Sequence, residues 1–162
     1  GDPIADIMTA SDTISQATGY TPNTLVVGSI VDRALMGHPD VLDRIKYTQS
    51  ATNASVRSAI AAVLGIENYL VSSAIYNTAN EGAAASTSPV IDDDALLLYV
   101  NPSAGSFDIS AGKTFVWGGG GGEGTIYRYR DFSRHADVIQ IKEQWDQKVV
   151  ASALGYFWSD IV

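Results

Sequence analysis

The stretch TPNTLVVGSIVDRALMGHP, residues 21–39, decides the fold class of this chain, because it places a buried strand directly before a helix. Thr24–Gly28 is short and almost uninterruptedly apolar, a pattern typical of a central strand. Ser29, with Asp32 three residues later, predicts a capping box that opens a helix over Ile30–Met36.

The segments on either side extend this pattern. Asp2 followed by Pro3 is a good helix start, and Gly19 suits the left-handed residue that ends such a helix. The later residues predict two more helices and then mostly strands, with long loops over 78–94 and 101–112. The expected helices cover 39–45 and 54–64, and the expected strands cover 68–76, 95–100, 113–117, 125–130, 137–142, 148–153 and 156–162. Helices that alternate with strands early, and strands that dominate late, indicate an α+β fold.

Composition and charge exclude several classes of function. The 162 residues are enough for one domain, and the absence of cysteine excludes a disulfide framework or a thiolate metal site. The net charge is −8, and its distribution is uneven: residues 1–112 hold twelve acidic and four basic residues, while residues 113–162 hold six of each. We therefore expect no tight binding to nucleic acid. The apolar runs are too short to cross a bilayer and the first residues carry no basic segment, so we expect neither a membrane span nor a signal peptide.

The run WGGGGGEGTIY, Trp117–Tyr127, looks like a phosphate-binding loop. Gly119, Gly121 and Gly124 satisfy the spacing G-x-G-x-x-G, but a dinucleotide site needs a helix to begin at the last glycine. Here the residues that follow alternate as a strand, and Glu123 would put a negative charge where a phosphate belongs. A Walker loop would also need Lys-Ser or Lys-Thr after the last glycine. We therefore interpret the run as a flexible hairpin connection without a bound nucleotide.

No other group of residues predicts a catalytic or metal site. Asp92–Asp94 is not followed by the alternating oxygen ligands, the glycine and the distal glutamate of a calcium loop. His38 and His135 are the only histidines, and no G-x-S-x-G elbow offers a serine for His135 to activate. We therefore predict no catalytic residue, no cofactor-binding residue, no metal ligand and no cofactor, and a protein that is not an enzyme.

The segment YRYRDFSR after the glycine run interleaves aromatic and basic residues, a mixture that can bind single-stranded nucleic acid. On a strand, however, Tyr127 and Tyr129 share one face while Arg128 and Arg130 share the other. We interpret the segment as a strand with an aromatic face toward the core and a basic face outward. An alternative is a small-ligand or carbohydrate-binding domain that uses Trp117, Tyr127 and Tyr129 as a stacking platform.

Two longer segments carry a combined pattern. In TGYTPNTLVVGSIVDRALMGHPDVLDRIKY, Thr18–Tyr47, a helix ends in Gly, a Pro-Asn-Thr turn leads into an apolar strand, and the next helix ends near His-Pro-Asp. In ADVIQIKEQWDQKVVASALGYFWSDIV, Ala136–Val162, two terminal strands surround a Lys-Val-Val and a Gly-Tyr. Together these segments resemble the major capsid proteins of tailed bacteriophages.

The resemblance implies the Hong Kong 97-like fold, in which an axial domain lies near the capsomer axis and a peripheral domain carries a long spine helix and long strands. It assigns residues 1–20 to the end of the spine helix, 21–117 to an axial-domain-like α+β region and 118–162 to strands returning to the peripheral domain. Family members also have an N-terminal arm and an extended loop before the spine helix. Nothing in this sequence corresponds to them, so we expect a fragment of a longer subunit.

The function that the resemblance implies is structural. Copies of the full-length protein would associate into pentameric or hexameric capsomers and tile the icosahedral capsid of a virus or prophage. The virion would be the location of the protein, after assembly in the bacterial cytoplasm, and scaffold or decoration proteins would be further partners. A shell protein of an encapsulin-like nanocompartment is an alternative, because those shells share the fold.

Overall fold

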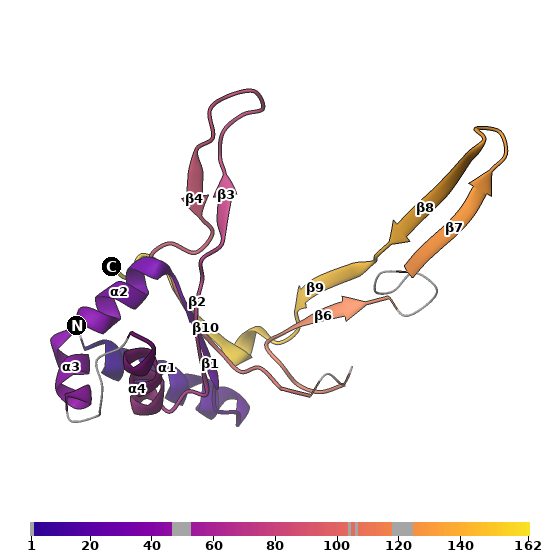
Figure 1. Cartoon of the computed structure of the whole chain (residues 1–162). Coiled ribbons are helices and arrows are strands. Elements are labelled where there is room, and N and C mark those ends of the chain that lie inside the picture. The colour runs from indigo at the N-terminus through magenta and orange to yellow at the C-terminus, as the bar shows by residue number, and fades with distance from the viewer. Residues whose placement is uncertain (1, 47–52, 104, 106, 118–124) are drawn as a thin grey trace. The chain divides into compact units, whose positions relative to one another are not determined.

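A computed structural model describes residues 2–46, 53–103, 105, 107–117 and 125–162. The chain divides into two compact units, which we call the body (Gly1–Ala111 and Ala151–Val162) and the arm (Gly112–Val150). Figure 1 shows helices together with strands in the body, and strands in the arm. The mixture confirms the α+β class. The central glycines, residues 118–124, lie outside the described residues.

Helix α1 (Pro3–Thr18) begins and ends where the sequence predicts. The Asp2 carboxylate accepts hydrogen bonds from the N–H groups of Ile4 at 3.0 Å and Ala5 at 3.3 Å, which satisfies two donors of the first turn. Gly19 ends the helix with a φ of 77°, a conformation that glycine adopts without a steric penalty.

The body is built on a four-stranded sheet with the order β10-β5-β1-β2. Strand β1 (Thr24–Val27) runs parallel to β2 (Asn68–Val71) and antiparallel to β5 (Ala95–Leu98), which pairs in turn with β10 (Gly155–Trp158). The predicted central strand is confirmed, because β1 has a neighbour on each side and its Leu25 is completely buried. A short 3-10 helix over residues 152–154 precedes β10.

Three further helices belong to the body: α2 (Ser29–Gly37), α3 (Pro39–Ile45) and α4 (Asn53–Leu64). The predicted capping box before α2 is wrong, because Gly28 is the N-cap and no side chain caps the helix. Aliphatic side chains from the helices and the sheet form two buried clusters, and each buried Val, Leu or Ile stabilises the fold by roughly 1.5–3 kcal/mol. The first cluster comprises Ala10, Ile14, Leu25, Val27, Val31, Leu35, Ile66, Ala95 and Leu97, and the second comprises Ile4, Val41, Ile45 and Ile60.

The region predicted as a loop over 78–94 contains a strand. Strand β3 (Ile75–Asn77) pairs antiparallel with β4 (Thr87–Pro89) in a two-stranded ribbon (Figure 1). The Asn77 side-chain oxygen accepts hydrogen bonds from the N–H groups of Ala79 and Ser86, both at 3.0 Å, and so closes the ribbon at its turn. β4 could not be predicted from the sequence, because Thr87, Ser88 and Pro89 show no alternation of apolar and polar residues. The strand expected over 68–76 is likewise divided into β2 and β3.

The arm is a hairpin built in two segments. Strand β6 (Gly112–Val116) pairs with β9 (Trp145–Val149), and β7 (Thr125–Asp131) pairs with β8 (Ala136–Lys142). The strands predicted on either side of the glycine run are thus confirmed. They do not pair with each other, however, so a hairpin turn at the run is wrong, and the paired strands β7 and β8 are joined at residues 132–135 instead.

Candidate functional site

The residues singled out for chemistry are dispersed. His38 caps α3, since its Nδ1 accepts a hydrogen bond from the Asp40 N–H at 3.3 Å, and His135 lies in the turn of the arm with a φ of 52°. The backbone of Asp93 and Asp94 accepts hydrogen bonds from the N–H groups of Ile161 and Gly28, both at 3.1 Å. Within the described ranges, no group of three or more acidic or histidine side chains could hold a metal ion. The prediction that the glycine run binds no nucleotide lies outside those ranges and stays a prediction.

The body also contains a buried ionic cluster that sequence reasoning missed. Asp32 on α2 is 3% exposed, and its carboxylate accepts hydrogen bonds from Arg57 Nε at 3.2 Å, Arg57 Nη2 at 2.6 Å and the Tyr69 hydroxyl at 3.0 Å. Burial, together with the Asp32 charge, raises the pKa of Tyr69, and the hydrogen bond to Asp32 raises the pKa of Arg57. The cluster therefore links α2, α4 and β2, and we interpret it as structural because its three members satisfy one another.

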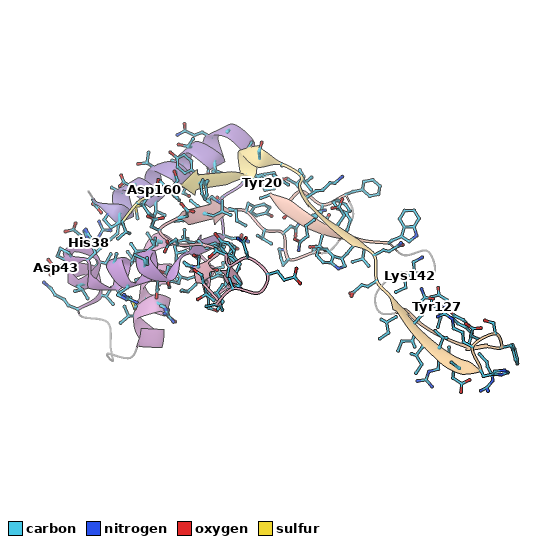
Figure 2. The ribbon with its side chains drawn as sticks, turned by 90° about the horizontal axis from the view of Figure 1, so that it is seen from above. Tyr20, His38, Asp43, Tyr127, Lys142 and Asp160 are labelled. Carbon is cyan, nitrogen blue, oxygen red and sulfur yellow. The ribbon has the colours of Figure 1, made fainter. Side chains whose placement is uncertain are left out.

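The β7–β8 ladder of the arm exposes isoleucines on one face. Ile126 lies opposite Ile141, and Arg128 lies opposite Ile139, so these four side chains share that face. Each of the three isoleucines is more than half exposed. Figure 2 shows the side chains of this ladder standing out from the ribbon beside the labelled Tyr127.

The other face of the same ladder carries the two tyrosines. Tyr127 lies opposite Gln140 and Tyr129 lies opposite Val138, which confirms the predicted sharing of a face. The predicted packing of this face against a core is wrong, because Tyr127 is 40% exposed and Tyr129 is 55% exposed. The ribbon is two strands wide, and both of its faces are open in this chain.

On one face of the β6–β9 ladder, apolar side chains flank the polar pair Thr114–Gln147, and the other face carries the charged side chains. Val116 lies opposite Trp145, and the register places Val149 on the same face, all three of them exposed. The opposite face carries Lys113, Phe115, Asp146 and Lys148. A two-stranded ribbon is at best marginally stable in water, and soluble monomers rarely expose apolar patches of this kind. The arm therefore has the exposed apolar surface that is typical of an interaction site.

The outer face of the body sheet adds a second open apolar surface. The registers place Leu70, Val26, Leu96 and Phe157 in one row across all four strands. Leu70 and Phe157, at the two ends of the row, are more than half exposed. Since Leu25 and Leu97 on the inner face are fully buried, the sheet is covered on one side only.

A groove of about 250 Å³ lies in the body near the end of the chain. Its lining includes the apolar residues Ile7, Leu25, Val27, Val31, Ala34, Leu35, Ala95, Trp158, Ile161 and Val162. The ionisable residues of the lining are Asp6 and His38. Figure 2 shows the labelled His38 and Asp160 at this end of the body.

None of the helices in the described part of the chain is long and apolar enough to cross a membrane. Large exposed apolar surfaces are typical of sites where a protein contacts other molecules. Residues 1–111 match the family model of phage major capsid protein E. This chain belongs to that family. The resemblance to phage major capsid proteins noted in the sequence is thereby confirmed.

The chain is also similar to a curated protein in sequence and to a solved structure in fold. The chain is 31% identical over 75 residues to the major capsid protein of Burkholderia phage BcepMu, a match that covers 46% of this chain and 24% of that protein. Its fold is similar to that of a phage-related protein from Bordetella bronchiseptica RB50, with a TM-score of 0.76 and 24% identity. That likeness covers 97% of this chain and 49% of the solved chain, so the chain spans about half the length of the solved relative.

Proposed function

We propose that this chain is part of the structural subunit of an icosahedral phage or prophage capsid and that it acts by association with copies of itself into pentameric or hexameric capsomers. The observation that carries the proposal is the arm, whose two-stranded ribbon leaves large apolar side chains open on both ladders. Membership of a capsid protein family supports other copies of the same chain as the partners, because a shell is built from many copies of one subunit.

The finer features of the subunit belong to the same proposal. We assign it the Hong Kong 97-like fold, a place in the virion after assembly in the bacterial cytoplasm, and no enzymatic activity. Scaffold or decoration proteins are further partners, and tight nucleic-acid or membrane binding is not part of the function. The division of the chain at residues 20 and 117 into peripheral and axial parts stays a prediction.

The charge distribution supports a shell that does not adhere to the nucleic acid within it. The body carries thirteen acidic and four basic residues, while the arm carries five acidic and six basic ones. A net charge of −9 on the body repels a phosphate backbone, and the nearly neutral arm adds no basic run.

Electron microscopy of the protein expressed from its complete gene tests the proposal. We expect rings or closed particles for the natural sequence and their loss when Trp145 and Val149 are both replaced by Ser. Replacement of Asp146 and Lys148 by Ser is the matched control, because these side chains lie on the charged face of the same strand, and particles should persist. A natural protein that stays monomeric at high concentration would contradict the proposed function.

A further inference from the structure

The tip of the arm presents a single aromatic side chain on a preorganised turn. Phe132 follows the last residue of β7 and is 78% exposed. The Asp131 carboxylate accepts hydrogen bonds from the Ser133 hydroxyl at 2.6 Å and from the Ser133 N–H at 3.0 Å, which holds the turn around Phe132. A cross-strand ion pair of 2.9 Å between Arg130 and Asp137 closes the ladder beside it. A turn held in this way loses little backbone entropy when it binds.

The groove of the body has a size and lining that suit such a side chain. An apolar cavity of about 150 Å³ in a protein is large enough to bind benzene, and this groove measures about 250 Å³. Val31 and Leu35 of α2 line it together with Trp158 of β10, which offers an aromatic surface to a phenyl ring. The groove is thus large enough for one phenyl ring and part of a turn beside it.

The charges around the two surfaces are complementary. Three arginines, Arg128, Arg130 and Arg134, surround Phe132 in sequence, against two aspartates. On the body, Asp6 lines the groove, and Asp160 precedes Ile161 of the lining. The body as a whole is strongly acidic, whereas the arm carries a slight positive excess. Opposite charges of this kind guide an arm toward a body and set its orientation.

We propose that Phe132 at the arm tip of one copy inserts into the apolar groove on the body of a neighbouring copy. The proposal rests on the proposed function, since it names the surfaces through which capsid subunits meet. Phe132 and the groove are different parts of the same chain, so one copy can insert its Phe132 into one neighbour and receive the Phe132 of another, which is a heterologous contact. A heterologous contact repeats from copy to copy and closes into a ring when the rotation between copies allows it.

Engineered cysteines test this contact directly, because the natural chain has no cysteine. Copies of the full-length protein with Arg134→Cys, an exposed position of the same turn that leaves Phe132 in place, are assembled with an excess of copies that carry Ala34→Cys in the groove, any cysteines elsewhere in the protein having been replaced. Ala34 is exposed and lines the groove, so a disulfide between the two variants reports insertion. We expect covalent dimers after oxidation. The pair of Arg134→Cys with Ala83→Cys, an exposed site in the β3–β4 ribbon, should remain uncoupled.

The outcomes separate the two proposals. Particles that form without the disulfide between positions 134 and 34 would overturn the insertion and leave the proposed function standing. Absence of particles from the natural protein would overturn both. In a second measurement, Phe132→Ser should lower the yield of particles about tenfold or more. Phe107→Ser, a change at a fully exposed phenylalanine of the body, should leave the yield unchanged, and equal yields for the two variants would contradict the proposal.

Discussion

Asn23 and Val100 are joined by two hydrogen bonds across 77 residues of sequence: Asn23 Nδ2 donates to the Val100 carbonyl at 2.8 Å, and Asn23 Oδ1 accepts from the Val100 N–H at 2.9 Å. The Asn23 backbone completes the connection, since its carbonyl accepts from the N–H of Asn68 and its own N–H donates to Leu98. One residue of the Pro-Asn-Thr turn therefore ties the entrance of β1 to the strands on both sides.

Replacement of Asn23 by Asp should destabilise the body. The new carboxylate has no N–H for the Val100 carbonyl and places a negative charge beside it. We expect the free energy of unfolding to fall by about 1–3 kcal/mol, measured by urea denaturation. Asn101→Asp is the matched control: the Asn101 side chain acts as an acceptor for the Ser103 N–H, a role that an aspartate keeps, so stability should be nearly unchanged.

The buried carboxylate of Asp32 should matter far more than an exposed one. Asp32→Asn removes the charge that Arg57 and Tyr69 contact, and we expect a loss of about 2 kcal/mol in the free energy of unfolding. Asp43→Asn removes a carboxylate that is 76% exposed and pairs with Lys46, so its cost should be below about 0.5 kcal/mol. Equal effects of the two substitutions on the urea midpoint would contradict the structural role of the cluster.

Tyr69 should make stability sensitive to alkaline pH. Its pKa in the folded protein lies above the ordinary value of 10.0, so the folded state holds the phenolic proton more tightly than the unfolded state does. The resulting stabilisation is complete below pH 10.0 and is lost as the pH rises through the folded pKa. The natural chain should therefore lose stability more steeply above pH 10.0 than Tyr69→Phe, as followed by circular dichroism. Tyr76→Phe, at an exposed tyrosine, should retain the natural slope.

Gly28 should not tolerate a side chain. A Cβ at this position would collide with the backbone carbonyl of Asp92, and the Gly28 N–H donates to the Asp94 carbonyl at 3.1 Å, so neither segment can move away without losing that bond. We expect Gly28→Ala to cost about 3 kcal/mol, read from the melting temperature. Gly37→Ala, where a Cβ meets nothing within 4 Å, should change stability by less than about 1 kcal/mol.

Local signals in the sequence predicted much of the body. The Asp2 cap, Gly19 and the apolar run of β1 depend on neighbours in sequence, and the structure has the corresponding elements where they were expected. Strand partners depend on distant residues, which is why the glycine run was interpreted as a hairpin turn although β6 pairs with β9. The partners of Asp32 are also distant in sequence, since Arg57 and Tyr69 lie 25 and 37 residues away. The local pattern around Asp32 therefore indicates only a helix cap. One signal for the burial of Asp32 was present in the sequence: it lies on the same helix as the apolar Val31 and Leu35, which are both buried.

Both ends of the arm leave the body at one place. Ala111 and Ala151 are directly hydrogen-bonded, with a distance of 3.2 Å from the Ala151 nitrogen to the Ala111 oxygen, and the neighbouring β5 and β10 pair with each other on their own. A short turn between these two alanines can therefore stand in for the whole insertion. The contacts made by the arm can thus be altered as one cassette at this junction, while the strand pairs of the body are encoded outside it.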